Sequence, residues 1–143
     1  RKIDNPRLLA FVVLAEVGLQ GAYSNLILPK ALSESILEAN DRALATELVY
    51  GTLRMQGRHD HFISAASDRS LEQIDPKALI VLRLGTHQLK QMRVPSHAAI
   101  FESVELAKKV VGKSTTSFVN AILMLSIRIQ SSCLIRLRHN YLH

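Results

Sequence analysis

The chain has 143 residues, which suits a single domain with a sizeable buried core. Hydrophobic residues make up 48% of it and charged residues 21%, but Trp is absent and aromatics are scarce, so the core must consist of Leu, Ile, Val and Ala. The sequence contains neither the apolar run of about 18 residues that a membrane span requires nor a recognisable signal peptide. Cys133 is the single cysteine and cannot form an intramolecular disulfide, so we expect a protein of the reducing cytoplasm.

The net charge of +6 is confined to the last quarter of the chain. Residues 1–105 hold twelve Lys or Arg and twelve Asp or Glu, whereas residues 106–143 hold no acid. The excess basic residues are Lys108, Lys109, Lys113, Arg128, Arg136 and Arg138. Such asymmetry predicts a polyanionic partner, either nucleic acid or an anionic membrane surface, although a solvated basic face would give the same composition.

The apolar spacing is helical almost throughout the chain, beginning with Leu8, Phe11, Val12 and Ala15. Asn5 or Asp4 can cap this first helix, and Pro6 suits its first position. Gly18 and Gly21 are expected to end it.

Three further helices are predicted before residue 70. Pro29 indicates a short second helix from Pro29 to Leu37. Asp41 is expected to cap the third helix, which Gly57 interrupts, and Asp60 is expected to start the fourth.

The second half of the chain shows the same period more clearly. Three more helix starts are predicted, at Asp75-Pro76, at Pro95-Ser96 and at Thr115 or Thr116. An apolar series predicts the buried face of the last helix, at Phe118, Ile122, Leu125 and Ile129. Because no alternating strand pattern occurs, we predict an all-α fold, a compact bundle of about seven helices.

His59, Asp60 and His61 form a trio that resembles a metal site. A zinc site requires three or four convergent ligands, but side chains two residues apart point about 200° apart on a helix. The other histidines are scattered singly, at positions 87, 97, 139 and 143. We therefore expect no metal, and we interpret the trio as a helix junction in which Asp60 accepts the free amides of the next helix.

The sequence contains no motif for catalysis. It lacks a GxSxG nucleophile elbow, and its isolated glycines cannot form a P-loop or a GxGxxG cradle. Cys133 has no general base nearby in the sequence. We therefore expect that this chain by itself is not an enzyme and binds no cofactor.

Two stripes of charge follow helical spacing. The first would lie on one continuous helix and comprises Glu47, Tyr50, Arg54 and Arg58. The second comprises Arg83, His87 and Lys90. Each stripe can be a solvated face or an RNA contact, and Glu47 could simply pair with Arg54 or pack on Tyr50.

Five blocks of the sequence occur in an order typical of one family. They are residues 41–54 (DRALATELVYGTLR), 83–89 (RLGTHQL), 94–99 (VPSHAA), 102–109 (ESVELAKK) and 118–123 (FVNAIL). Together they resemble the NusB-like domain at the N-terminus of Sun/Fmu-type rRNA cytosine-5 methyltransferases, over roughly residues 5–125. Residues 48–54 are more similar to this methyltransferase branch than to free-standing NusB.

The resemblance implies an all-helical RNA-binding fold. NusB itself is a transcription antitermination factor that binds RNA with a small ribosomal protein as partner. In the methyltransferases, the domain precedes a Rossmann-like catalytic domain that uses S-adenosylmethionine and a Cys nucleophile. Nothing in this chain matches that catalytic half, since Cys133 follows Ser132 rather than the Pro of the family's nucleophile motif.

The last residues depart from the family's pattern. After residue 123 the family usually continues with a pair of arginines, whereas this chain has Met124-Leu125. We therefore divide the chain into a NusB-like helical RNA-binding domain, residues 1–125, and an atypical basic tail, residues 126–143, which could continue the last helix.

Eight residues are predicted to bind RNA. Six would neutralise backbone phosphates, namely Arg7, Arg54, Arg58, Lys108, Lys109 and Lys113. Phe118 and Asn120 are the candidates for base contact, because an aromatic face stacks on a base and an amide reads a base edge. The apolar series favours core packing for Phe118 instead, and Asn120 could serve only to cap or bridge helices.

These features predict an RNA-binding domain that forms the non-catalytic N-terminal part of an rRNA cytosine-5 methyltransferase. Its partner would be ribosomal RNA, in the cytoplasm and without membrane contact. One alternative is a free-standing NusB-type antitermination factor that acts through RNA and protein contacts, including a ribosomal protein. A remnant without independent function is another alternative, suggested by the atypical tail.

Overall fold

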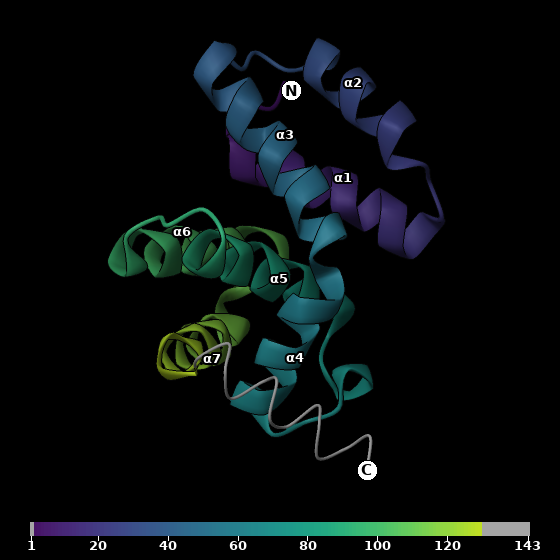
Figure 1. The fold of residues 1–143 in the computed structure, drawn as a ribbon. Helices are drawn as coiled ribbons and strands as arrows, with labels where there is room; N and C mark the ends of the chain where they lie inside the picture. Colours follow the sequence, from purple (N-terminus) through teal and green to yellow (C-terminus); the bar gives the residue numbers. More distant parts are fainter. Residues whose placement is uncertain (1, 130–143) are drawn as a thin grey trace. The chain divides into compact units, whose positions relative to one another are not determined.

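The computed structural model describes residues 2–129, and within that range it contains seven α-helices, two short 3-10 helices and no strand (Figure 1). The all-α prediction is therefore confirmed. The chain divides into two compact units, one ending at Gln56 and the other beginning at Gly57. Of the predicted tail, residues 126–128 form the end of the last helix, and residues 130–143 lie outside the described residues.

The first unit consists of α1 (Pro6–Gln20), α2 (Ser24–Glu34) and α3 (Ala39–Arg54), and α1 packs against both other helices (Figure 1). Asn5 caps α1 as predicted, since its Oδ1 accepts the backbone N–H groups of Arg7 and Leu8 at 2.9 and 3.2 Å. Gly21, at φ 73°, ends the helix in the left-handed conformation that glycine tolerates. The fully buried residues of this unit are Leu9, Ala10, Val13, Ala45, Leu48 and Val49.

The second helix differs from the prediction, because α2 begins at Ser24 and Pro29 lies inside it. Two contacts fix the helix on either side of the proline. Leu28 is buried, and the guanidinium of Arg42 donates a hydrogen bond of 2.9 Å to the carbonyl of Leu32. The preference of proline for a helix start is thus overridden by packing against the rest of the unit.

The third helix begins three residues earlier than predicted, at Ala39, with Glu38 instead of Asp41 in the cap position. Asp41 does not cap it but lies in its first turn. There the carboxylate interacts favourably with the positive end of the helix dipole.

The second unit is built around α5. Its elements are α4 (Gln56–Ser67), η1 (Leu71–Gln73), α5 (Pro76–Lys90), α6 (Ser96–Val110), η2 (Lys113–Thr115) and α7 (Thr116–Arg128). Helix α5 packs against α6 and α7, which also pack against each other, and nine of its fifteen residues are buried. Asp75 caps α5 as predicted, with Oδ1 accepting the N–H groups of Lys77 and Ala78 at 2.8 and 3.1 Å.

The buried face of α7 is rotated from the predicted one. Its buried residues are Val119, Ile122, Leu123 and Ser126, so that of the predicted series only Ile122 is buried. Leu125 is 47% exposed and Ile129 is partly exposed. The helix is apolar on most of its circumference, so spacing alone could not select the packed face. Ser126 is accommodated because its hydroxyl donates to the carbonyl of Leu123 at 2.9 Å.

Candidate nucleic-acid interface

Three of the predicted phosphate ligands follow one another along the connection between α6 and α7. Lys108 and Lys109 lie in the last turn of α6, and Lys113 begins η2; all three are exposed. Gly112 makes the turn between them with φ 151°, and its N–H donates to the carbonyl of Ala107 at 3.0 Å. The three ammonium groups therefore belong to one short basic segment, residues 108–113.

Phe118 lies five residues after Lys113, in the first turn of α7, and is partly buried. The guanidinium carbon of Arg69 lies 5.0 Å from the centroid of its ring, which is a cation–π distance. Phe118 therefore does not occupy the core position that the apolar series favoured. Arg69 was not among the predicted site residues, because it lies between α4 and η1, 49 residues before Phe118, and no local pattern relates the two.

Asn120 is exposed on α7, two residues beyond Phe118. Lys108, Lys109, Lys113 and Phe118 follow one another on α6, η2 and α7, with Arg69 against the ring of Phe118. We call these five residues the basic–aromatic face; the side chain of Asn120 points about 200° away from that of Phe118 on α7.

The remaining three predicted residues lie elsewhere. Arg7 is partly buried in the first turn of α1, and Arg58 is exposed on α4. Arg54 ends α3 and approaches Glu47 at 3.7 Å, so one of the two alternative roles foreseen for Glu47 is confirmed. The continuous stripe itself was a wrong prediction, because the helix breaks at Met55 and Arg54 and Arg58 belong to different units.

The second stripe is neither a solvated face nor an exposed RNA contact. Arg83 forms a bidentate pair with Asp60, with Nε and Nη2 donating to the two carboxylate oxygens at 2.7 and 3.0 Å. His87 is fully buried. The ammonium of Lys90 lies 4.7 Å from the ring centroid of Phe62 and donates to the carbonyl of Ile129 at 2.8 Å; burial lowers its pKa. These residues join α5 to α4 and to the end of α7.

The interpretation of the histidine trio as a helix junction was wrong. Helix α4 already begins at Gln56, so Asp60 lies inside it and binds Arg83 instead of capping. His59 is fully buried, and its Nε2 lies 2.9 Å from Nδ1 of His87. His61, by contrast, is exposed. Within residues 2–129, no group of three His, Cys, Asp or Glu side chains is arranged to hold a metal ion.

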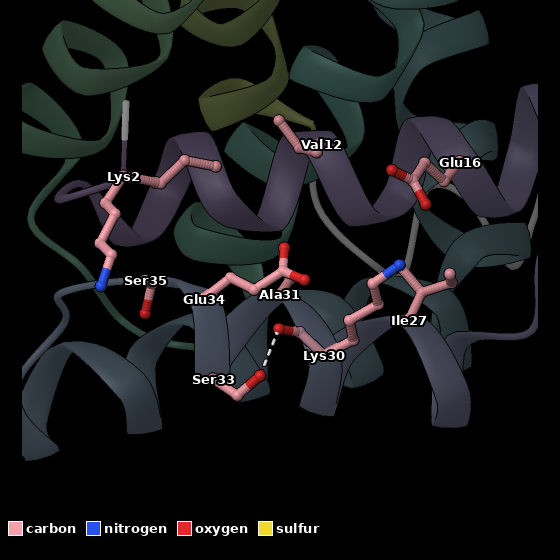
Figure 2. Close-up of a pocket in the computed structure, with 10 residues that line it drawn as sticks. Lys2, Val12, Glu16, Ile27, Lys30, Ala31, Ser33, Glu34 and Ser35 are labelled. Carbon is pink, nitrogen blue, oxygen red and sulfur yellow. Dashed lines mark hydrogen bonds between the residues drawn. The ribbon is translucent and has the colours of Figure 1, made fainter.

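The first unit contains a cleft of about 650 Å³ between α1 and α2, to which the predicted residues do not contribute (Figure 2). Val12 and Glu16 of α1 line one side, and Lys30 and Glu34 are among the residues of α2 opposite them. Two lysines and two glutamates line this cleft, with Lys2 as the second lysine. The balance of charge does not favour a phosphate ligand, so the basic–aromatic face is the better candidate site.

None of the helices in the described residues is long and apolar enough to cross a membrane.

Comparison with known proteins identifies the class of this helical fold. The chain is similar to one in the crystal structure of the antitermination factors NusB and NusE in complex with dsRNA, with a TM-score of 0.78 and 23% identity, covering 86% of this chain and 93% of that one. The model of the NusB family matches residues 4–128. The chain therefore belongs to the NusB family.

Two relatives have names that describe methyltransferases. A Mycobacterium tuberculosis protein named as a methyltransferase is 44% identical over 123 residues, which are 86% of this chain and 27% of that protein. The ribosomal RNA small subunit methyltransferase B of Thermus thermophilus is 38% identical over 122 residues, 85% of this chain and 30% of that enzyme. The chain thus spans less than a third of the length of these relatives.

Proposed function

We propose that this NusB-family chain is an RNA-binding domain that serves an rRNA cytosine-5 methyltransferase as its non-catalytic N-terminal part. Family membership and the names of the relatives support the general assignment. The RNA-binding assignment rests on the basic–aromatic face, where three exposed lysines precede a partly exposed aromatic ring, and on the exposed amide of Asn120 further along α7. Single-stranded RNA is recognised by this combination of phosphate neutralisation, stacking and amide hydrogen bonding.

In this proposal the chain binds the RNA, and the catalytic part of the parent enzyme methylates the cytosine. S-adenosylmethionine would bind to the catalytic part of that enzyme, and this chain would bind no cofactor. Ribosomal RNA in the cytoplasm is the proposed partner. The reading frame downstream of the coding sequence tests the assignment, because an S-adenosylmethionine-binding domain should follow there.

A free-standing antitermination factor is the second candidate, and the similarity to the NusB chain of the complex with NusE and dsRNA favours it. A stop codon directly after this sequence, together with saturable binding of a small ribosomal protein, would support this candidate over the first.

Salt titration of RNA binding tests the proposed face. Replacing Lys108, Lys109 and Lys113 together by Ala should weaken binding to single-stranded or loop RNA for most sequences alike. Each phosphate contact contributes a slope of about −0.7 in log affinity against log salt, so the triple variant should reduce the slope by about 2. The affinity is measured by fluorescence anisotropy between about 50 and 200 mM salt, the range over which such contacts dominate.

A matched control removes the same charge from elsewhere on the surface. Lys2, Lys30 and Lys77 are also exposed, and their triple Ala variant should keep the slope of the unmodified chain. Equal losses in both triple variants would show that only net charge matters, and would contradict the proposed face. Asn120→Ala should change the preference between RNA sequences more than the salt slope, because an amide at a base edge carries sequence information.

A further inference from the structure

Two imidazole rings are buried against each other in the second unit. His59 of α4 and His87 of α5 are both 0% exposed, and their ring centroids lie 5.1 Å apart with an interplanar angle of 74°. The distance of 2.9 Å between Nε2 of His59 and Nδ1 of His87 requires one proton between these two nitrogens.

Nδ1 of His59, the ring nitrogen that does not face His87, determines which ring donates that proton. This nitrogen is buried and has no hydrogen-bond partner among the described residues. A buried N–H without an acceptor is less favourable than a buried lone pair without a donor, so we assign the proton to Nε2 of His59. Nδ1 of His87 is then the acceptor, and the pair is neutral.

The charges around the pair oppose protonation. From α4, Arg58 and Asp60 flank His59, and from α5 the neighbouring charged groups are Arg83 and Lys90. Asp60 is already bound to Arg83 through both carboxylate oxygens, so it offers no acceptor to a protonated His59. A proton on Nδ1 of His59 would therefore be a buried positive charge without an acceptor, which is strongly unfavourable.

We propose that the His59–His87 pair is an acid-sensitive joint between α4 and α5, which closes when both rings are neutral and opens when His59 takes up a proton. The consequence for RNA rests on the proposed function: α5 supports α6 and α7, and Arg69 follows α4, so opening the joint would disturb the basic–aromatic face. Acid strong enough to open the joint would then weaken RNA binding through the fold.

The direction in which pH changes the stability follows from the pKa of His59 in the folded and unfolded chain. Burial, followed by the electrostatic repulsion that a proton on His59 would meet from His87, Arg58 and Arg83, lowers the pKa of His59 from 6.5 to about 3 in the folded chain. Above about pH 6.5 the ring is neutral whether the chain is folded or not. Below that pH the unfolded chain binds a proton that the folded chain does not, so stability decreases from about pH 6.5 down to about pH 3. The folding constant decreases by up to tenfold for each pH unit in this window.

The test compares the pH dependence of stability in the full chain and in His59→Gln. The amide nitrogen of Gln can still donate to Nδ1 of His87 but has no titrating group. Between pH 7 and pH 5, the folding constant of the unmodified chain should decrease by about 30-fold more than that of His59→Gln, since 1.5 pH units of the window are crossed. Urea unfolding followed by circular dichroism gives both constants, and His61→Gln, an exposed histidine on the same helix, should behave like the unmodified chain.

A second measurement does not depend on the variant being folded. In the unmodified chain, the imidazole carbon–hydrogen resonances of His59 should not titrate between pH 8 and pH 5, because burial lowers the pKa of His59 to about 3. A titration of His59 near pH 6.5, or equal pH dependence in His59→Gln and the unmodified chain, would overturn the proposal. RNA binding need not be measured, so failure of the proposed function would not be mistaken for failure of this joint.

Discussion

Gly85 lies at the closest approach of α5 to its two neighbours in the second unit. A Cβ atom at this position would lie 2.7 Å from Oγ of Ser103 on α6 and 2.8 Å from Cδ1 of Leu123 on α7. Both neighbours are buried, so neither can move freely away. The absence of a Cβ atom at Gly85 therefore allows α5 to pack this closely against α6 and α7.

Gly85→Ala should destabilise the fold by about 1–3 kcal/mol, the usual penalty for overpacking a core. Gly57→Ala is the matched control, because Gly57 lies in α4 of the same unit and a Cβ there meets nothing within 4 Å. This control should be neutral or stabilising by up to about 1 kcal/mol, since alanine favours helix. The urea midpoints of unfolding of the two variants measure this difference. Equal midpoints would mean that α5, α6 and α7 can accommodate the methyl group at position 85 without loss of stability.

Residues whose role depends on a distant partner were those that sequence reasoning misjudged. Asp60 has the features of a helix cap, but Arg83, 23 residues further on, holds its carboxylate inside α4. His59 was placed at a helix junction, although it pairs with His87 in the core. Local spacing predicts which residues share a helix face, but it contains no information on which helix lies opposite.

At the level of the helix, the starts that were predicted correctly are those where a side-chain cap is followed by a proline. Asn5-Pro6 and Asp75-Pro76 mark real helix starts because a capping carboxamide or carboxylate and a proline act within three residues of one another. The start of α2 was missed because Tyr23 makes no side-chain cap there and the proline lies inside the helix. The buried face of α7 was missed because its apolar residues surround the helix.

Helix α2 is expected to be the least stable of the seven described α-helices. It buries only Leu28, lacks a side-chain cap and contains Pro29, which removes one backbone donor. Its backbone amides should therefore exchange with deuterium faster than those of α1 in the same unit. Mass spectrometry of peptides from residues 6–20 and 24–34 gives this comparison, and Pro29→Ala should slow the exchange of α2. Equal protection of α1 and α2 would contradict the expectation.

At the level of the whole chain, sequence and structure contribute different parts of the assignment. The five ordered blocks were sufficient to predict the family, and the match over residues 4–128 confirms it. The division into two compact units was not evident from the sequence, because a predicted helix break at Gly57 does not indicate which helices pack together on either side of it. Of the residues of the basic–aromatic face, Arg69 was not among the predicted RNA-binding residues, because its contact with Phe118 depends on tertiary structure.

The backbone of Gly112 has a consequence for the rates of binding. At φ 151° and ψ 162° it occupies a region that is almost restricted to glycine, so Gly112→Ala should force Lys108, Lys109 and Lys113 out of their present arrangement without changing the net charge of +6. The association rate depends on the long-range field of the whole molecule, whereas the dissociation rate depends on local fit. Stopped-flow measurements with RNA should therefore show an unchanged association rate and severalfold faster dissociation for Gly112→Ala, with Gly18→Ala as the control at an exposed glycine. Slower association of Gly112→Ala with RNA, at an unchanged dissociation rate, would contradict the expectation that Gly112 acts through the local placement of the three lysines.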